Sequence, residues 1–423
     1  MKRVVAFLLA LSFFLDPLLL YAADQLALAP LIEEALKSNP QILAAAKRYE
    51  SAKARIPQAK ALDDPVIGLK FEKAKGNPFN LDTTPAMDRM LSISQMLPFF
   101  GKLSLKGKIA LVESQMYAAD YKDTQLEVIN DVEKAYYDLF MNHKEIELKQ
   151  QSLDLLNSVA KVAEAKYAVS EVTQEEVLKI YSEIARLNND LINLHQMQSQ
   201  KNTRLNTLLN RDPEGELGEP VLSEDFAFSQ DVGSLYKDTL ENQPELLMFS
   251  YAIEKNKYGV SLAKKSYFPD MMAGIVMRGL ASGSIGPWDL MMAFSVPLWF
   301  WTKQKYQVKE AVANLEEAKS AYQMMKNNAL EETKNLFTST EISKNRIRLY
   351  KTDLIPIIES SLSSSLAAFR SGIGNFMLLL DSERMLIKTK MDYYAALVEY
   401  NMNLSDLKRQ TGIDLKEVKD ESK

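Results

Sequence analysis

The chain has 423 residues, of which 47% are hydrophobic and 25% are charged, and its formal net charge at pH 7 is -5. This length allows one large domain or several ordinary ones, and the charge balance lacks the basic excess that is typical of nucleic-acid-binding proteins. The absence of cysteine excludes disulfides, thiolate metal sites and a cysteine nucleophile. Because the two histidines, His143 and His195, have no recognisable catalytic partner, we predict that the protein is not an enzyme and has no cofactor or metal site.

The N-terminus has the pattern of a secretory signal peptide. Two basic residues precede an apolar run over positions 4–20, and small residues at positions 22 and 23 suit cleavage. The alternative is an uncleaved membrane anchor, which Asp16 and Pro17 within the run disfavour. No later stretch approaches the roughly 18 to 20 apolar residues that a membrane-spanning helix needs. We therefore expect residues 1–22 to be removed and the mature chain to be exported, either as a soluble protein or as an outer-membrane β-barrel.

Two halves of the sequence resemble each other at a nearly constant offset. The stretch Leu31–Pro40 matches Leu235–Pro244 at an offset of 204 residues. Further along, Tyr167–Ser170 matches Phe369–Gly372 at an offset of 202. Such matches in the same order predict a duplicated structural unit. We expect a first repeat over 23–212, a connector over 213–233, a second repeat over 234–413 and a charged tail over 414–423.

Each predicted repeat begins with a helical segment, over about 31–60 and about 234–265, and continues into a much longer one. Residues 108–212 contain neither glycine nor proline, and the same is true of residues 298–355. In the first of these stretches, apolar residues recur every three or four positions and form one helix face. A helix over about 101–167 would be on the order of 100 Å long. We therefore expect it to pack lengthwise against similar helices.

Local signals mark where these helices reverse or bend. Thr173 followed by Glu176 is a capping-box pattern, which predicts a reversal near 169–173 and a new helix after it. The glycine-containing stretch 371–375 predicts the equivalent reversal in the second repeat. Pro356 predicts a kink, because proline cannot continue the helical hydrogen bonds.

Four short runs alternate between apolar and polar residues, as strands do: about 65–74, 87–96, 269–279 and 288–296. In the last run, Trp288, Leu290 and Met292 share one side. A two-residue period over roughly ten residues suits a strand with lipid on one side and a polar lumen on the other. Nineteen methionines could supply soft metal ligands, but neighbouring pairs in a strand face opposite sides, so we predict no metal site from them.

Aromatic residues gather in and beside the predicted strands, as they do at membrane–water interfaces. These aromatic residues are Phe99, Phe100, Tyr267, Phe268, Trp288, Trp299 and Trp301. The alternative is an ordinary hydrophobic cluster that caps a soluble sheet. Four strands cannot close a barrel alone, and open edges in lipid would leave backbone groups unpaired at several kcal/mol each. If the sheet faces lipid, it must therefore close by oligomerisation.

The duplicated helix–strand–strand–helix unit resembles the TolC family of outer-membrane efflux proteins over nearly the whole mature chain. The residues that carry the resemblance are Asn39–Pro40, Gln243–Pro244, Gln95–Lys102, Phe369–Gly372 and Leu380–Asp381. Within the family, the run Pro98–Leu103 looks most like the heavy-metal efflux branch.

The resemblance implies a mainly α-helical homotrimer with a small membrane β part. Three protomers would form a 12-stranded outer-membrane β-barrel that continues into a 12-helix periplasmic α-barrel. This would be the passive exit duct of a tripartite pump, docked on a periplasmic adaptor (membrane fusion) protein and an RND-type inner-membrane transporter, with heavy-metal cations as the favoured substrates. Two alternatives remain: the same duct used for drugs or type I protein secretion, and a soluble periplasmic coiled-coil adaptor or scaffold.

The resemblance also assigns roles to the two helix-hairpin tips, about 167–177 and about 369–381. The tips would close the periplasmic end of the duct, with Asp381, Glu176 and Phe369 at the gate. The residues expected to contact the adaptor are Arg370, Ser371, Gly372, Ile373, Val169, Ser170 and Glu171.

This chain departs from the family pattern at three tip positions. Leu378 replaces a second gate aspartate, Gly374 replaces an arginine that can bridge to it, and Ser170 replaces an expected glycine. Simpler explanations also remain open: Glu176 is favoured at any helix start, Asp381 could be a solvated surface residue, and a tight turn needs glycine for its backbone angles alone.

Overall fold

The computed structural model describes residues 26–72, 88–222, 224, 228, 230–279 and 286–413. The predicted signal peptide and the predicted charged tail lie outside these residues. Internal contacts divide the chain into two compact units. The hairpin unit comprises the described residues within 1–33, 133–225 and 348–398, and the sheet unit comprises those within 34–132, 226–347 and 399–423. Each unit thus combines segments from both predicted repeats.

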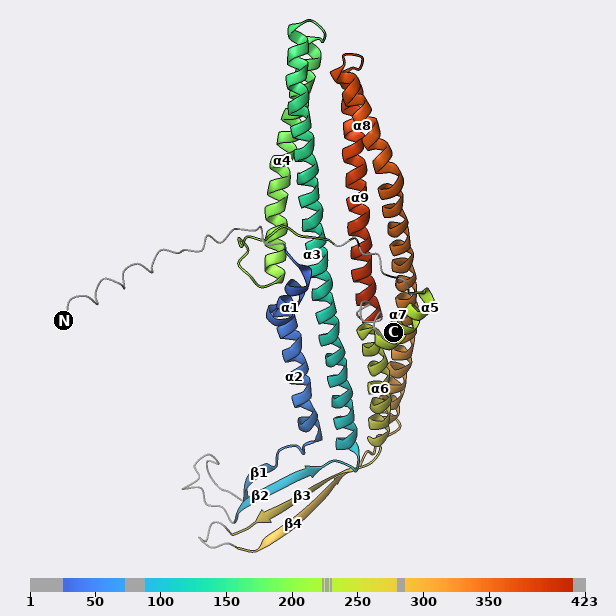
Figure 1. The fold of residues 1–423 in the computed structure, drawn as a ribbon. Coiled ribbons are helices and arrows are strands. Elements are labelled where there is room, and N and C mark those ends of the chain that lie inside the picture. The colour runs from blue at the N-terminus through green and yellow to red at the C-terminus, as the bar shows by residue number, and fades with distance from the viewer. Residues whose placement is uncertain are drawn as a thin grey trace, which may run out of the picture. The chain divides into compact units, whose positions relative to one another are not determined.

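The sheet unit contains a four-stranded antiparallel sheet in which the strands follow the order β1, β2, β3, β4 (Figure 1). The strands are β1 (Val66–Glu72), β2 (Asp88–Leu97), β3 (Asp270–Met277) and β4 (Trp288–Ser295). All four lie where the alternation predicts strands. The central pair, β2 and β3, comes from two different repeats, so the sheet joins the repeats at its centre and leaves β1 and β4 at its edges.

The helical segments before β1 and β3 are each divided into two helices, which differs from the expectation of one segment. Helix α1 (Leu28–Ser38) is followed by α2 (Pro40–Lys60), and α5 (Val232–Asn242) is followed by α6 (Pro244–Lys265). The breaks fall at Asn39 and Gln243.

Proline explains both breaks. A residue before proline is pushed out of the helical region, and Asn39 and Gln243 are both extended, with ψ of 125° and 119°. Each proline then occupies the first helical position, where its missing N–H is not needed. The Asn39 side chain adds a cap by accepting the N–H of Gln41 at 2.8 Å.

The long helices expected from the sequence are present. Helix α3 (Lys102–Ala168) has 67 residues, which confirms the continuous helix predicted over about 101–167. The other long elements are α4 (Gln174–Leu208), α7 (Gln304–Leu349), α8 (Ile355–Arg370) and α9 (Phe376–Thr411). None of the helices in the described ranges combines the length and the apolar character that crossing a bilayer requires.

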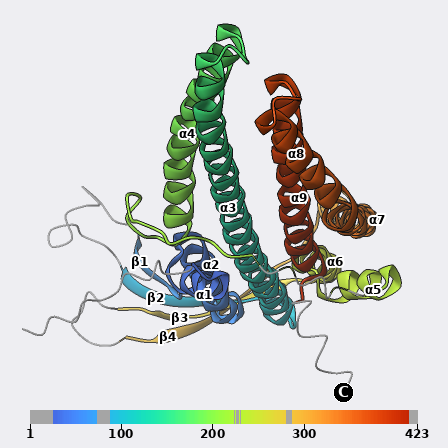
Figure 2. The same ribbon diagram turned by 45° about the horizontal axis from the view of Figure 1, so that its top comes forward.

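In the hairpin unit, α3 runs beside α4 and α8 runs beside α9, so each repeat contributes one helical hairpin (Figures 1 and 2). One buried apolar cluster includes residues from all four helices. Its largest fully buried members are Leu156 on α3, Ile180 on α4, Phe369 on α8 and Phe376 on α9. The two hairpins therefore share one core.

Between α7 and α8, Tyr350–Leu354 form a π-helical turn. Pro356 has no N–H for the carbonyl of Thr352, four residues earlier. Just before it, the N–H of Ile355 donates to the carbonyl of Tyr350, five residues earlier. The regular α-helix is thus interrupted just before Pro356 by one widened turn, while the kink itself stays a prediction.

The start of α4 has the predicted capping box. The Thr173 hydroxyl accepts the N–H of Glu176, and the Glu176 carboxylate accepts the N–H of Thr173, each at 3.3 Å. Two of the four N–H groups that a helix start leaves unpaired are satisfied in this way. Helix α4 therefore begins at a point fixed by local chemistry.

Both hairpin turns contain a residue in the left-handed backbone region, at corresponding positions of the two repeats. Gly372 has φ of 79°, and Ser170 has φ of 63°. Serine thus adopts at the first turn the conformation that glycine supplies at the second. For a residue with a β-carbon this conformation costs roughly 1 to 2 kcal/mol.

The connector between the repeats is fastened to α3 by Tyr136, which is almost fully buried. The Tyr136 hydroxyl accepts the N–H of Val221 at 2.8 Å and donates to the carbonyl of Leu26 at 2.6 Å. Leu26 in turn donates its N–H to the carbonyl of Glu219 at 2.9 Å. A single tyrosine therefore holds the first described residue and the connector on one helix.

Replacing Ser170 with glycine should stabilise the first hairpin turn. Glycine adopts positive φ without steric strain, although it loses more backbone entropy on folding, so we expect the free energy of unfolding to rise by about 0.5 to 1 kcal/mol. Thermal denaturation of the detergent-solubilised protein would measure the change.

Ser371→Gly is the matched control, because Ser371 has φ of -80° in the ordinary helical region. This substitution should leave the stability unchanged or reduce it. An equal gain from both substitutions would contradict the assignment of strain to Ser170.

Candidate functional sites at the hairpin turns and the sheet

The predicted gate residues occupy three different environments in the hairpin unit. Asp381 is exposed on α9. Glu176 is half-buried and takes part in the cap of α4. Phe369 is only 2% exposed and lies in the shared core, 6.5 Å from Phe376 between ring centres. The exposed side chain of Asp381 is therefore free to face a pore. Glu176 stabilises the start of α4, and Phe369 packs inside the protomer.

The predicted adaptor-contacting residues lie at the surface of the two turns. Val169 and Ile373 are large apolar residues that are 66% and 88% exposed. The side chain of Arg370 and the other turn residues, Ser170, Glu171, Ser371 and Gly372, are also exposed. Exposed apolar side chains at the end of a hairpin are suited to contact another protein.

The two turns lie against each other. Lys166, at the end of α3, forms an ion pair with Glu171 at 3.0 Å. A β-carbon added to Gly372 would lie 3.1 Å from the Lys166 amino nitrogen. The positive φ of Gly372 therefore favours glycine at this position, and the lysine side chain of the first turn lies close beside it.

A group of charged and polar contacts below the turns was not found from the sequence. Glu183 on α4 accepts hydrogen bonds from Arg186 at 2.5 and 2.6 Å and from Arg384 of α9 at 2.9 Å. Glu383 directly precedes Arg384 in α9 and is 4% exposed. It hydrogen-bonds to Ser152 of α3, which is also 4% exposed. Residues of α9 thus bind both helices of the first hairpin.

The two glutamates of this group have opposite electrostatic environments. Burial raises the pKa of the Glu383 carboxyl, and the Ser152 hydrogen bond opposes this effect only in part. Burial acts in the same direction on Glu183, but the hydrogen bonds from Arg186 and Arg384 lower the pKa of the Glu183 carboxyl overall. The ionised form is therefore favoured more strongly at Glu183 than at an ordinary glutamate, and less strongly at Glu383.

In the sheet unit, the strand register separates two faces. Residues directly opposite each other in neighbouring strands point to the same side, and the row Ile67, Ile93, Ile275 and Leu290 runs across all four strands. The apolar face consists of Ile67, Leu69, Phe71, Leu91, Ile93, Leu97, Met271, Ala273, Ile275, Met277, Trp288, Leu290, Met292 and Phe294, together with Gln95 and Arg89.

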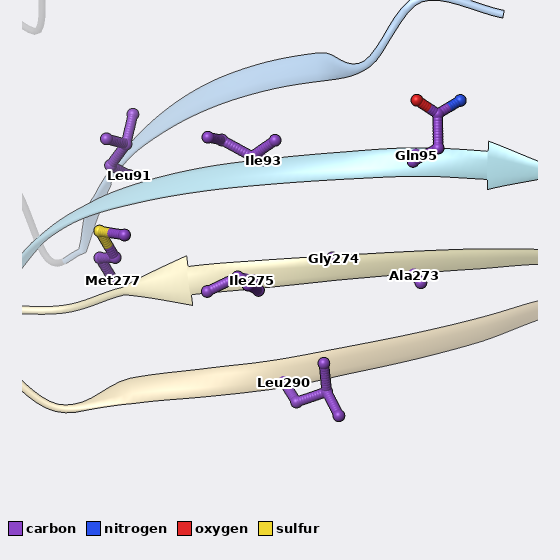
Figure 3. Close-up of a pocket in the computed structure, with 8 residues that line it drawn as sticks. All are labelled: Leu91, Ile93, Gln95, Ala273, Gly274, Ile275, Met277 and Leu290. Atoms are coloured by element: carbon purple, nitrogen blue, oxygen red, sulfur yellow. The ribbon is translucent and has the colours of Figure 1, made fainter. Parts of the chain in front are cut away.

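The apolar face is open in the protomer. Leu290 is 64% exposed, and Ile67, Trp288 and Phe294 are similarly exposed. Figure 3 shows a shallow apolar hollow on this face, with Leu91 and Ile93 from β2 and with residues of β3 and β4 around it. Such a continuous exposed apolar surface is unusual for a protein in water and is typical of a surface that contacts lipid or another protein.

The opposite face carries smaller and more polar side chains. Its members are Val66, Gly68, Lys70, Met90, Ser92, Ser94, Met96, Asp270, Met272, Gly274, Val276, Asp289, Met291, Ala293 and Ser295. The sheet is therefore amphipathic, as the alternation predicts, although methionine and valine make the second face mixed.

Most of the predicted interface aromatics lie where the strands meet the helices, whereas Trp288 lies at the other end of the sheet, opposite Met277. Phe99 stacks on Phe268, with ring centres 4.5 Å apart, and Trp301 makes edge contacts with Trp299 and Phe300. Phe100, Tyr267, Phe268, Trp288, Trp299 and Trp301 are all exposed in the protomer. The aromatic residues at the strand–helix junctions therefore form the cluster described here, and the contact of these residues and of Trp288 with a membrane stays a prediction.

An acidic residue beside this cluster was not found from the sequence. The Asp270 carboxylate accepts the N–H of Phe99 at 2.7 Å and pairs with Lys102 at 2.8 Å. It thereby ties the start of β3 to the turn that follows β2. Only the pairing of strands from different repeats brings these residues together.

The two histidines lie near each other on the first hairpin. The Gln198 side chain lies between them, 2.9 Å from His143 Nε2 and 3.4 Å from His195 Nδ1. His195 thus contacts Gln198, a residue that the sequence did not mark as its partner. Burial lowers the pKa of the half-buried His143. Throughout the described ranges, no cluster of three or more histidine and carboxylate side chains is placed to hold a metal ion.

Known proteins resemble this chain over lengths that range from about half to nearly all of it. The family described as outer membrane efflux protein matches residues 31–211 and 235–412. The cobalt-zinc-cadmium resistance protein CzcC of Cupriavidus metallidurans is 19% identical over 380 residues, which cover 89% of this chain and 87% of CzcC. The fusaric acid resistance protein FusA of Burkholderia cepacia is 21% identical over 237 residues, which cover 53% of this chain and 44% of FusA.

A solved structure shows the same fold. The crystal structure of CusC, whose title refers to transmembrane channel formation, superposes with a TM-score of 0.81 over 92% of each chain, at 16% sequence identity. The two stretches that match the family lie within the two predicted repeats and include both the sheet and the hairpin turns. This chain belongs to the outer membrane efflux protein family, and it is a non-enzymatic efflux channel of the outer membrane that extends into the periplasm.

Proposed function

We propose that this chain forms a homotrimer in which three sheets close one 12-stranded barrel and the helices form a duct across the periplasm. The observation that supports this proposal is the amphipathic sheet with β1 and β4 at its edges. In lipid, each unpaired edge group would cost several kcal/mol. Pairing β1 of one protomer with β4 of the next satisfies both edges and closes a ring after three steps.

The two faces of the sheet support one orientation in this trimer. The apolar face, which contains Leu290 and Ile67, would contact lipid. The opposite face, which contains Ser92, Ser94 and Asp289, would line the water-filled lumen. The exposed aromatic cluster would lie near the membrane surface, where ring side chains are favoured.

The family works as the outer-membrane channel of tripartite pumps, and we propose that the partners here are a periplasmic adaptor and an RND-type inner-membrane transporter. The exposed turn residues, among them Val169 and Ile373, suit the adaptor contact. Energy would come from the transporter, because the duct itself conducts passively. Membership of the family excludes the soluble periplasmic scaffold considered from the sequence.

Heavy-metal cations are the favoured cargo. The support comes from the similarity to a cobalt-zinc-cadmium resistance protein over 89% of this chain. In a trimer, exposed Asp381 would be repeated three times around the axis, and such a ring of carboxylates attracts cations and repels anions. Glu176 would add a second ring if its side chain leaves the α4 cap.

Organic compounds are the second candidate cargo, because the fusaric acid resistance protein resembles about half of this chain. A wide water-filled duct discriminates little between solutes, so the transporter would decide the cargo. The two candidate cargoes, metal ions and organic acids, can therefore be distinguished only by testing the complete pump.

Deletion of the gene in its native host tests the cargo. Loss of the exit duct should lower the inhibitory concentrations of cobalt, zinc and cadmium salts severalfold, because the pump can no longer expel these cations. Growth assays would measure this, with restoration by the intact gene as the control. Increased sensitivity to fusaric acid without any change toward the metals would instead support the organic cargo.

A charged substitution on the apolar face tests the orientation of the sheet. Leu290→Arg should reduce the yield of heat-modifiable trimer in the outer-membrane fraction, because an arginine facing mid-bilayer lipid costs about 2 to 4 kcal/mol per protomer. Ala293→Arg introduces the same charge into the same strand on the opposite face, and it should assemble normally. Equal loss from both substitutions, or normal assembly of Leu290→Arg, would contradict the proposed orientation.

Removal of the gate carboxylates tests the pore-facing role of the tips. Asp381→Asn combined with Glu176→Gln should reduce the preference for cations in planar-bilayer recordings, because the rings lose their charge. Glutamine can still complete the capping box, so α4 should keep its start. Glu175→Gln is the control, since Lys179 already pairs with Glu175 at 2.6 Å. Unchanged selectivity in the double variant would refute the gate assignment.

A further inference from the structure

Two adjacent residues of α9 connect the second hairpin to both helices of the first. Glu383 hydrogen-bonds to Ser152 of α3, and Arg384 pairs with Glu183 of α4 at 2.9 Å. Successive residues of an α-helix point about 100° apart, so neighbouring side chains reach different partners. These four side chains form a polar link between the two hairpins below the turns.

The Glu383 carboxyl is buried at this link. It is 4% exposed, and its side-chain partner, the Ser152 hydroxyl, is equally buried. An ionised carboxylate is expensive to bury unless a positive charge compensates it. A protonated carboxyl can occupy the same place as a neutral donor and acceptor.

The charged groups that face Glu383 from every neighbouring helix leave its charge poorly compensated. On α4, Glu183 is negative. On α3, Lys149 is engaged with Asp190 at 2.9 Å, and on α9 Arg384 is engaged with Glu183. On α8, Ser365 bonds to Ser382 and Glu359 pairs with Lys390, so this helix offers Glu383 no positive charge within the described contacts.

We propose that Glu383, Ser152, Arg384 and Glu183 form a proton-sensitive clasp that holds the second hairpin against the first. With the hairpins packed, Glu383 carries a proton and bonds to Ser152 as a neutral group. When the hairpins separate, water solvates the carboxylate and the proton passes to bulk solvent. The ion pair between Arg384 and Glu183 is the proton-independent half of the clasp, because Glu183 remains ionised.

The sign of the pH effect follows from the environment of Glu383. Burial holds the pKa of its carboxyl above the ordinary value of 4.5 in the packed state, whereas the separated state has the ordinary value. Below about pH 4.5 both states are protonated, and the clasp has its full strength. As the pH rises through the interval between the two values, the equilibrium shifts toward separation by up to about tenfold per pH unit. Above the raised pKa of the packed state, a further rise in pH no longer shifts the equilibrium between packed and separated hairpins.

The consequence for transport rests on the proposed function. If the hairpin turns form the periplasmic end of the duct, a less acidic periplasm loosens the packing of the second hairpin and favours opening. An acidic periplasm keeps the end closed. Closure would then respond to a buried group within each protomer as well as to the exposed gate residues.

Spin labels on the two turns measure the clasp without reference to transport. The chain has no cysteine, so Val169→Cys with Ile373→Cys gives one labelled pair, and both positions are exposed. Trimers assembled with excess unlabelled chain report the distance within one protomer by double electron–electron resonance. The ratio of long to short distances should rise severalfold between about pH 4.5 and about pH 8.5.

Three substitutions in the labelled protein decide the outcome. Glu383→Gln imitates the protonated carboxyl and should keep the ratio low and independent of pH. Ser152→Ala removes the hydrogen bond that opposes the effect of burial, so the transition should move to higher pH. Glu359→Gln, the same chemical change in a carboxylate that pairs only within the second hairpin, should leave the pH profile unchanged.

A flat profile for the parent, or an identical profile for Glu383→Gln, would overturn the clasp. If the control Glu359→Gln also loses the pH dependence of the distance ratio, the clasp is overturned, because the effect is then not specific to Glu383. Planar-bilayer conductance of the same variants separates this failure from failure of the proposed function. A pH-dependent distance without any pH-dependent conductance would leave the clasp intact and refute its role at the duct entrance.

Discussion

The need to pair backbone groups at the edges of a sheet dominates this structure. Strands β1 and β4 lie at the edges of a sheet that presents a continuous apolar face. In water an exposed apolar face of this kind favours aggregation, and in lipid the edge groups have no solvent to bond. Both problems disappear only when copies of the chain supply the missing neighbours. The need for association with further copies therefore follows from elementary hydrogen bonding, whereas the proposed number of three copies comes from the resemblance to the family.

Duplication explains how one chain builds such a sheet. The central strands, β2 and β3, come from different repeats, and the long helices between them must leave the sheet and return to it. The same duplication places two hairpins beside each other, and they share one apolar core. Because the halves have diverged, equivalent positions now use different chemistry: Ser170 adopts at one turn the left-handed backbone that Gly372 adopts at the other.

Local chemistry explains which features the sequence predicted. The strands, the capping box at Thr173, the disruption at Pro356 and both turns depend on residues close together in the chain, and all were found. The breaks at Asn39 and Gln243 also carry a local signal, because each residue precedes a proline, but the helical periodicity around them hid it. The links of Glu383 to Ser152 and of Asp270 to Lys102 join residues more than 160 positions apart, and no single-sequence pattern marks such pairs. The gate roles of Asp381 and Glu176 remain predictions, since they depend on the arrangement of three chains.

The unequal size of the side chains on the two faces of the sheet has a geometric consequence. Bulky residues such as Leu290 crowd one face, while Gly68, Ser92 and Gly274 keep the other thin; a β-carbon added to Gly68 would meet the Ser92 hydroxyl oxygen at 2.7 Å. Glycine within a strand often marks a place where a sheet bends, as at the corners of a barrel. In the proposed barrel, the face with the smaller side chains would be the concave one, so these side chains would leave the channel wide.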